Sequence, residues 1–155
     1  MLYDEQQVNL TTLVNILKNA FFNVSDIEED RFKIIVDEFP IYIKFDVEKK
    51  RIQLSSLDRL KEHTPNLYSE LLEAVNTSNK SLINVRSYVE IYEGLIFLTV
   101  QQDISYSKGL IIEQFIELLR LFDKIALAVY RNHISSVINK ALLHIDLKVD
   151  TSPSN

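Results

Sequence analysis

Histidine side chains are the first candidates for chemistry, because imidazole binds metals and exchanges protons near neutral pH. The chain has three, His63, His133 and His144. The nearest two are eleven residues apart. None belongs to a His-Glu-x-x-His or Glu-x-x-His motif, whose spacing would place two ligands on one face of a helix. We therefore expect surface, capping or partly buried roles for all three, and no metal site.

Nucleophiles and phosphate-binding loops are equally poorly represented. The chain has no cysteine and no Gly-x-Ser-x-Gly motif. A loop that cradles phosphate needs several glycines so that backbone N–H groups can approach the anion, and the chain has only Gly94 and Gly109. Glu113 and Glu117 lie one helical turn apart, but on the expected polar side of a helix, where charge is normal. The sequence predicts no catalytic residue and no cofactor, and so a protein that is not an enzyme.

The charge distribution disfavours nucleic acid as a partner. The chain has 22 acidic and 17 basic residues and a net charge of −5, whereas phosphate binding needs clustered lysine and arginine. The one tight basic cluster, Lys49-Lys50-Arg51, falls between two strand patterns, where a hairpin tip is polar in any case. The acidic segment from Asp26 to Asp30 is either a solvated connection or a docking site for a basic partner.

The sequence also disfavours a membrane. No apolar run approaches the roughly 20 residues that span a bilayer. The first residues lack the basic and apolar regions of a signal peptide, and the absence of cysteine excludes a disulfide framework. We therefore expect a cytoplasmic protein without membrane contact.

Alternation of apolar and polar residues predicts five strands. Three follow one another early in the chain, with turns at Phe39-Pro40 and at 48–50, and two follow later, joined by a turn at Glu93-Gly94. The predicted strands are 32–36, 41–47, 52–55, 82–91 and 95–104. One-sided alternation of this kind indicates an antiparallel sheet with one face on a core.

Helical periodicity flanks and separates these strands. Residues 4–22 have the pattern of an amphipathic helix, and Asp4 and Gln7 stand at the spacing of a capping box. Thr64-Pro65 predicts the start of a second helix, with threonine as the N-cap and proline at the first helical position. The apolar stripe of this helix ends near Asn79.

A third helical pattern begins near Gly109, and its apolar stripe changes register near Asn132-His133. Either this helix continues with a rotated apolar face, or a short break starts another helix. The resulting order, α-β-β-β-α-β-β-α, predicts a single α+β domain over 1–148, in which helices pack on one face of an antiparallel five-stranded sheet. The C-terminal tail, 149–155, is expected to be disordered.

Several apolar residues fall at positions that face away from the expected core. If the sheet packs its helices against the parity that holds Ile34 and Ile43, the opposite face carries large apolar side chains. They are Ile35, Tyr42, Tyr88 and one parity of the last strand, which is either Leu95 and Phe97 or Ile96, Leu98 and Val100; we take Leu95 and Phe97 as the outward pair. These residues form a partner-binding surface if they are contiguous. Otherwise they are scattered over an ordinary solvated sheet face. The order of the strands decides whether these residues are contiguous or scattered.

The segment from Leu71 to Asn79 is a leucine-rich helix closed by asparagines before the fourth strand. Both this segment and the order of elements from about residue 8 to about residue 130 resemble the YbjN-type family. That family is similar in fold to the class I type III secretion chaperones, such as the Tir chaperone. The resemblance implies a bacterial protein that forms homodimers and binds other polypeptides without catalysis. It also singles out Asn76 and Asn79, for which we expect a helix-end capping role.

Two functions are compatible with these features. We predict a non-catalytic, chaperone-like protein-binding module that acts as a homodimer and holds a polypeptide partner of unknown identity. The alternative is a small acidic regulatory or immunity-type inhibitor, which would bind a basic partner through the acidic segment and depend on salt.

Overall fold

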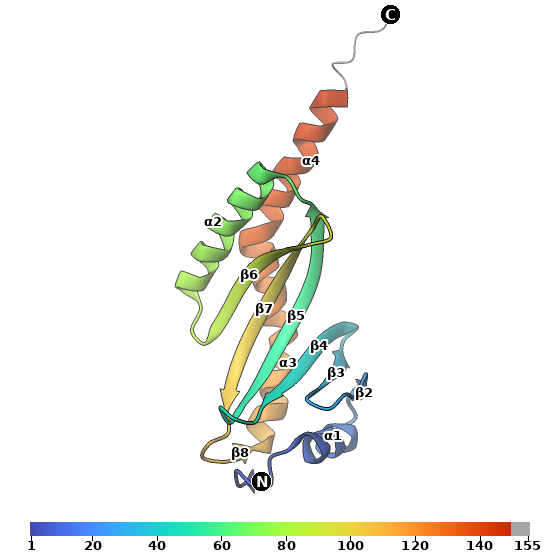
Figure 1. Cartoon of the computed structure of the whole chain (residues 1–155), viewed down its shortest axis with the longest axis vertical. Coiled ribbons are helices and arrows are strands. Elements are labelled where there is room, and N and C mark those ends of the chain that lie inside the picture. Colours follow the sequence, from blue (N-terminus) through green and yellow to red (C-terminus); the bar gives the residue numbers. More distant parts are fainter. Residues whose placement is uncertain (150–155) are drawn as a thin grey trace, which may run out of the picture. The chain divides into compact units, whose positions relative to one another are not determined.

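The computed structural model describes residues 1–149, and it describes side chains through Leu143 (Figure 1). The predicted disordered tail lies outside these residues, except for its first residue. The chain divides into two compact units. The first comprises residues 1–56 and 101–126, and the second comprises residues 57–100 and the chain from 127 onward.

A six-stranded antiparallel sheet is the main β structure. Its strands are β2 (Asn23–Ser25), β3 (Arg31–Val36), β4 (Phe39–Asp46), β5 (Arg51–Glu62), β6 (Val85–Tyr92) and β7 (Leu95–Ser105). They lie in the order β2-β3-β4-β5-β7-β6. The α+β class is confirmed, but the predicted number of five strands is wrong. The sequence does not reveal β2, because three residues are too few to show a period of two.

A separate two-stranded sheet also departs from the predicted order of elements. Here β1 (Leu2–Tyr3) pairs antiparallel with β8 (Leu110–Ile111). Gly109 precedes β8 with a φ of 89°, and a Cβ at this position would lie 2.5 Å from the carbonyl oxygen of Tyr3. Only glycine permits so close an approach in this conformation. Strands of two residues carry no alternation, so the pattern gave no sign of them.

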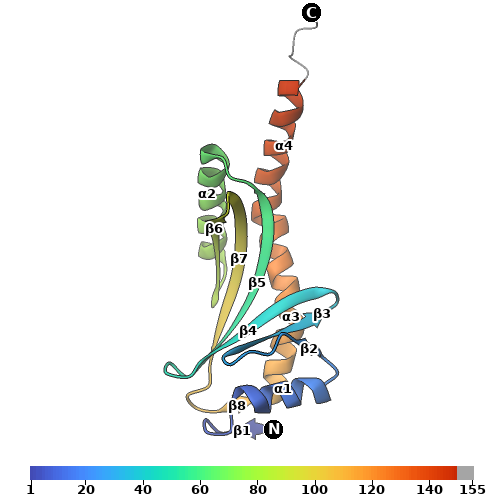
Figure 2. The ribbon, with the colours of Figure 1, turned by 45° about the vertical axis from the view of Figure 1, so that its right-hand side comes forward.

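In the first unit, the sheet packs against α1 (Leu10–Asn19) and the first part of α3 (Ile112–Val129). Figure 2 shows α1 beside the short strand β2. The inward residues of the sheet are fully buried, as the alternation predicts: Phe32, Ile34, Ile41, Ile43, Ile52 and Leu54. The helices contribute Leu13, Leu17, Phe115, Leu119 and Phe122 to this core.

The first helix begins later than predicted. The N–H of Asp4 donates to Gln7 Oε1 (3.0 Å), and the N–H of Gln7 donates to Asp4 Oδ1 (3.1 Å). These are the contacts of a capping box, but they close an isolated turn. Asn9 then adopts an extended backbone, with φ −146° and ψ 168°, and its Oδ1 accepts the N–H of Thr12 at 2.9 Å. Asn9 is therefore the N-cap of α1.

The hairpin between β3 and β4 turns at Asp37-Glu38 and not at Phe39-Pro40. Both turn residues have positive φ, 47° and 69°, which is the geometry that matches the twist of two antiparallel strands. Pro40 lies inside β4, opposite Ile35. Glutamate is rarely found in this conformation, so the residue types did not signal the turn. The turn at Glu93-Gly94, in contrast, lies where it was predicted.

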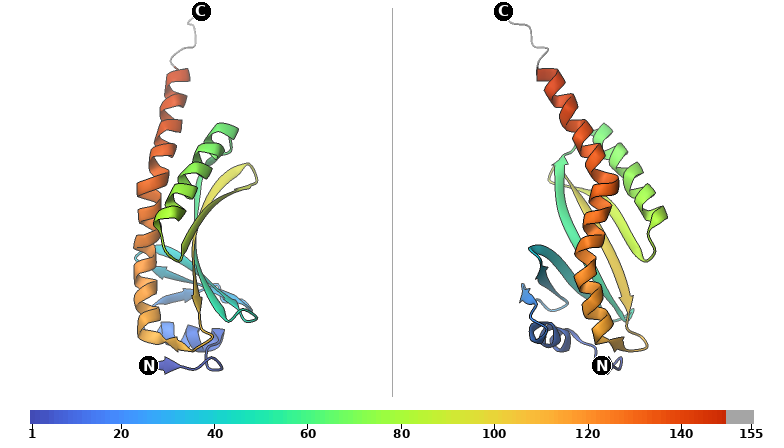
Figure 3. Two further views of the ribbon diagram at one scale, coloured as in Figure 1. Left: turned by 90° about the vertical axis from the view of Figure 1, so that its left-hand side faces the viewer. Right: turned by 180° about the vertical axis from the view of Figure 1, so that it is seen from behind.

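In the second unit, α2 (Pro65–Ser81) lies along β6 and against α4 (Ser135–Val149) (Figure 3). It begins as predicted, because Thr64 Oγ1 accepts the N–H of Leu67 at 3.3 Å. It ends two residues beyond Asn79. The core of this unit contains Leu67, Leu71, Val75, Val85, Val89, Ile96, Leu98, Val100, Val129, Ile134 and Ile138.

The helix that follows β8 continues through the predicted register change. Between α3 and α4 the backbone forms a π-helical turn, η1 (Tyr130–Ile134). Val129 and Ile134 are both buried, five residues apart, where a regular helix would allow three or four. The extra residue in the wider turn restores the alignment of the apolar stripe. The helix therefore continues through Asn132-His133 without a break, but its apolar face is kept in line by the wider turn and is not rotated.

Candidate functional site

The predicted partner-binding residues of the first unit are Ile35 and Tyr42, on neighbouring strands. The register of β3 and β4 pairs Lys33 with Tyr42 and Ile35 with Pro40. Ile35 and Tyr42 are therefore diagonal neighbours on the sheet face away from the core. Tyr42 is 40% exposed, whereas Ile35 is half-buried. This part of the surface is small and lies among charged side chains of the same strands.

The second unit has the larger apolar surface. Tyr88 of β6 and Leu95 and Phe97 of β7 alternate with buried residues of the same strands, so they point away from the core, as predicted. Tyr92 of β6, which the sequence analysis did not single out, packs edge-on against Phe97 with ring centroids 6.5 Å apart. We call Tyr88, Tyr92, Leu95 and Phe97 the outer aromatic surface. Tyr92 could have been found from its parity, which is that of Tyr88.

Asn79 occupies a site that the sequence did not predict. Its Nδ2 donates to the carbonyl oxygen of Ser87 (2.8 Å), and its Oδ1 accepts the N–H of Ser87 (2.7 Å). The hydroxyl of Ser87, which is buried, donates to the same Oδ1 at 3.1 Å. The side chain of Asn79 therefore ties α2 to the main chain of β6, eight residues later.

We expected Asn76 and Asn79 to cap the end of α2, but the structure shows a different arrangement. α2 continues past both residues and ends before Leu82, whose backbone is extended. Asn76 is exposed, and no hydrogen bond involves its side chain among the described residues. The two asparagines are three residues apart on the helix, but only Asn79 faces β6. Of the pair, Asn79 alone has a visible structural role, and that role is a tertiary contact.

A polar network centred on Arg51 lies on the outward face of the first unit. Arg51 Nη1 donates to Asp103 Oδ2 (2.9 Å), and Nη2 donates to Asp46 Oδ2 (3.1 Å). Gln53 and Gln101 both donate to Asp103 Oδ1, at 3.3 and 3.1 Å. The N–H of Lys49 and, next, the Arg51 guanidinium hold the pKa of Asp46 below its usual value. The network fixes the base of the β4–β5 hairpin.

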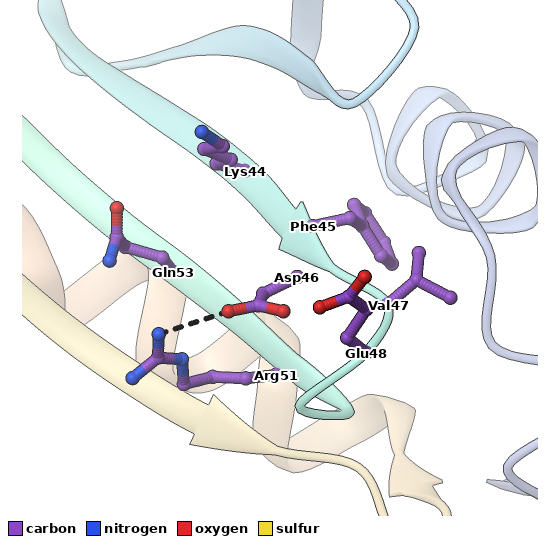
Figure 4. A pocket seen from close by; sticks show the side chains of 7 residues that line it. All are labelled: Lys44, Phe45, Asp46, Val47, Glu48, Arg51 and Gln53. Carbon is purple, nitrogen blue, oxygen red and sulfur yellow. Dashed lines mark hydrogen bonds and ion pairs between the residues drawn. The ribbon is translucent and has the colours of Figure 1, made fainter.

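A depression with a volume of about 340 Å³ lies beside this network, and Figure 4 shows the side chains that line it. Its lining combines charges of both signs with two apolar side chains: Lys44, Phe45, Asp46, Val47, Glu48, Arg51 and Gln53. The cations of the neighbouring basic cluster are already paired. Lys50 contacts Glu5 at 3.1 Å, and Lys49 contacts Asp46 at 3.8 Å. The cluster therefore offers a phosphate group little uncompensated charge.

The acidic segment is largely neutralised by its own strands. Asp26 pairs with Lys33, and Glu28 and Asp30 both contact Arg31, at 3.1 and 3.0 Å. Asp30 also lies 3.5 Å from Lys44. The hydrogen bond from Arg31 lowers the pKa of Asp30, and the hydrogen bond to Asp26 raises the pKa of Lys33. The segment is a set of surface ion pairs that brace β3 and β4.

Neither a metal cluster nor a membrane helix is present among residues 1–149. No group of three or more histidine, cysteine, aspartate or glutamate side chains is arranged to hold an ion there. No helix in this range is long and apolar enough to cross a membrane. His63 is exposed at the end of β5, where its N–H donates to the carbonyl oxygen of Gly94 at 2.8 Å and its ring meets Tyr68.

Comparison with protein families identifies the relatives of this chain. The model of the YbjN family, which carries the description "Putative bacterial sensory transduction regulator", matches residues 9–133. This match covers well over half of the sequence. The chain belongs to the YbjN family. None of the curated proteins matches it significantly.

A solved structure of a YbjN protein has the same fold. It is titled "Crystal structure of YbjN, a putative transcription regulator from E. coli". The two chains share 21% sequence identity with a TM-score of 0.62, over 88% of this chain and 93% of the E. coli chain. The predicted resemblance to the YbjN family is thus confirmed. The YbjN family match includes the outer aromatic surface and Asn79, and it ends inside the π-helical turn.

Proposed function

We propose that this YbjN-family chain is a non-catalytic, chaperone-like protein-binding module, which acts in the cytoplasm as a homodimer and holds a polypeptide partner. The outer aromatic surface carries the proposal. Tyr92 is 65% exposed and Tyr88 is 37% exposed, although burying such side chains is strongly favourable. Contiguous apolar residues of this kind mark interaction surfaces, and tyrosine is common among the residues that dominate binding energy.

The regulatory role in the family description is compatible with a protein that acts by binding. A regulator needs no catalytic group if its partner changes state on association. The resemblance to the YbjN-type family implies a similarity in fold to the class I type III secretion chaperones, and such a similarity would favour a polypeptide as that partner. We retain it as part of the proposal.

The acidic inhibitor is the weaker candidate. It needs carboxylates that are free to meet a basic partner, but Asp26, Glu28 and Asp30 all contact cations of this chain. A partner would have to displace these ion pairs, and only part of the Coulomb attraction would then be gained.

Solution mass tests the homodimer. Two chains would weigh about 36 kDa, twice the 18.1 kDa of one. We expect light scattering to show this mass at micromolar concentration. A double variant, Tyr88→Ser with Phe97→Ser, should then give the monomer mass while its circular dichroism stays unchanged. Leu72→Ser is the matched control, because Leu72 is similarly exposed (39%) in the same unit but lies on α2.

Two outcomes would count against this proposal. A wild-type protein that is monomeric throughout the micromolar range contradicts the homodimer. A dimer that persists in the double variant places the interface elsewhere. If the double variant unfolds, the single Tyr88→Ser change provides the comparison, since Tyr88 is the more exposed of the two.

A further inference from the structure

The free edge of the sheet at β6 has the hydrogen-bonding pattern of an unfilled strand position. β6 is the last strand in the sheet order, so among residues 1–149 its only strand neighbour is β7. In an antiparallel pair, residues with N–H and C=O pointing away from the neighbour recur at every second position. The bonds between Ser87 and Asn79 identify Ser87 as one of these residues. Val89 and Ile91 are the next two.

The edge is occupied at Ser87 and becomes exposed towards its end, because Val89 is 5% exposed and Ile91 is 45% exposed. Among the residues that the structure describes, none forms a hydrogen bond with the outward N–H or C=O of Val89 or Ile91. The last three residues of β6, Glu90, Ile91 and Tyr92, are exposed on both faces of the strand. Proteins usually protect such edges with proline, charged side chains, a bulge or a covering helix. Val89 to Tyr92 contains no proline or lysine, and Glu90 is its charged residue.

Asn79 shows what kind of group this edge accepts. A residue on an added antiparallel strand would give one N–H to β6 and accept one N–H from it. The carboxamide of Asn79 forms that pair of bonds with Ser87, at 2.8 and 2.7 Å. A side-chain amide has the same donor and acceptor groups as a peptide bond. The Asn79 amide therefore forms the two hydrogen bonds that one residue of an added strand would form. No such group pairs with the next outward residues of β6 among the residues that the structure describes.

We propose that the edge of β6 from Val89 to Tyr92 binds an extended segment of another polypeptide by strand addition. The inference rests on the proposed protein-binding function and adds the mode of binding. Strand addition takes its affinity from main-chain hydrogen bonds and its selectivity from alternate side chains. The bound segment carries apolar residues beside Tyr88 and Tyr92, and a lysine or arginine opposite Glu90 between them.

Charge favours a foreign segment over a second copy of this chain. Two copies can pair their β6 edges symmetrically and use both Val89 and Ile91 only in a register centred on Glu90. That register places Glu90 directly opposite Glu90, and like charges in this position are destabilising. Registers shifted towards the start of β6 meet Ser87, which Asn79 already occupies. Registers shifted the other way meet Glu93, where the strand ends with a φ of 50°.

A designed peptide tests the proposal directly. The probe is a capped heptapeptide, Thr-Val-Thr-Lys-Thr-Val-Thr, which alternates apolar and basic side chains on one face. Amide hydrogen exchange of the full chain is followed by NMR as the peptide is added. We expect exchange at Val89 and Ile91 to slow at least tenfold at saturation. The same peptide with N-methyl groups on the two threonines that flank the lysine should give no protection, because it lacks the N–H groups that face β6.

Two variants at one position separate the backbone from the side chain. Ile91→Pro removes an outward N–H without removing a bond to β7, which an edge strand tolerates. Ile91→Ala keeps the N–H and shortens the side chain. We expect peptide protection at Val89 to be lost in Ile91→Pro and retained in Ile91→Ala. The thermal midpoints of both variants are measured first, and the N-methyl peptide provides an independent test if the proline variant is unstable.

Three results would overturn strand addition at β6. The first is no protection at Val89 and Ile91. The second is that the N-methyl peptide binds the wild type as well as the unmodified peptide does, or that the Ile91→Pro variant binds the unmodified peptide as well as the wild type does. If that binding is then lost in Phe97→Ser, the outer aromatic surface is the binding site. The proposed function would then survive without strand addition. The third is concentration-dependent protection of Val89 without peptide, which would make a second copy the occupant.

Discussion

The side-chain amide of Asn79 forms hydrogen bonds with both main-chain groups of Ser87, at 2.7 and 2.8 Å. The pair joins the last turn of α2 to the edge strand β6. Ser87 is buried, and these main-chain groups form their hydrogen bonds with this side chain. The contact thereby holds together two elements that are close in sequence but run in opposite directions.

Removal of this amide should destabilise the protein. Asn79→Ala leaves the N–H and C=O of Ser87 unpaired at a partly buried position, which costs about 1–3 kcal/mol. Asn76→Ala, three residues earlier on the exposed side of the same helix, should change the free energy of unfolding by less than about 0.5 kcal/mol. Urea unfolding of both variants checks this difference. Equal losses would mean that the effect comes from the helix and not from the contact.

Phe21 is expected to be a site of strain. It follows the end of α1 with a φ of 65°, and its side chain is 97% exposed. The left-handed conformation costs a residue with a Cβ about 1–2 kcal/mol, and the exposed ring recovers none of it by packing. Phe21→Gly should therefore stabilise the protein by about 1 kcal/mol, as measured by urea unfolding. Lys18→Gly, within the last turn of α1, should instead destabilise it by about 0.5–1 kcal/mol.

Asp58 should make stability depend on pH. Its carboxyl group lies on the inward side of β5, and burial raises its pKa above the ordinary value of 3.8. A raised folded-state pKa contributes stability below pH 3.8, and this contribution is lost as the pH rises through the folded-state pKa. Asp58→Asn should therefore be more stable than the wild type at pH 7, and the difference should shrink below pH 3.8.

Urea unfolding at pH 7 and pH 3.5 measures this effect. Glu70→Gln is the control, since Glu70 is an exposed carboxylate on α2, and we expect no significant change at either pH. A difference at Asp58 that stayed constant with pH would assign the gain to packing of the amide, not to removal of a buried charge.

The π-helical turn should tolerate the loss of one residue. Deletion of Asn132, which is exposed, would shorten the interval between Val129 and Ile134 to four, the spacing of a regular helix. The turn should become α-helical while the apolar stripe keeps its alignment. Deletion of Lys124 would instead rotate every later residue by about 100° and misalign Ala126 and Val129.

Far-UV circular dichroism and urea unfolding compare the two deletions. We expect the Asn132 deletion to keep the fold with a stability change of about 1 kcal/mol or less, and the Lys124 deletion to lose cooperative unfolding. Equal damage in both would show that the wide turn is not where the register is reset.

The elements that the sequence predicted correctly are those with strong local signals. The alternation from Phe32 to Leu54 identified the buried face of three strands, and Thr64-Pro65 located the start of α2. The register change at Asn132-His133 pointed to the π-helical turn, although the pattern alone left a break possible. In each case the information lies within about a dozen neighbouring residues.

The features that were missed depend on contacts between distant or unremarkable residues. Arg51 and Asp103 are 52 positions apart, and only the pairing of their strands brings them together. Asp37-Glu38 forms a tight turn without glycine, so composition placed the turn two residues late. The amide of Asn79 looked like a helix cap because its real partner, the main chain of Ser87, has no signature in the sequence. The predicted partner-binding role of Ile35, Tyr42, Tyr88, Leu95 and Phe97 stays a prediction.

The π-helical turn also has a consequence for the sequence on either side of it. The family match ends at residue 133, inside the turn that spans Tyr130–Ile134. Because the turn resets the phase of the helix, the sequence before it and the sequence after it need not share one periodic pattern. The sequence after the turn is constrained by its own packing, at Ile134 and Ile138 in the core of the second unit. The turn therefore allows each half of the helix to keep a regular apolar stripe of its own while both halves face the cores that they serve.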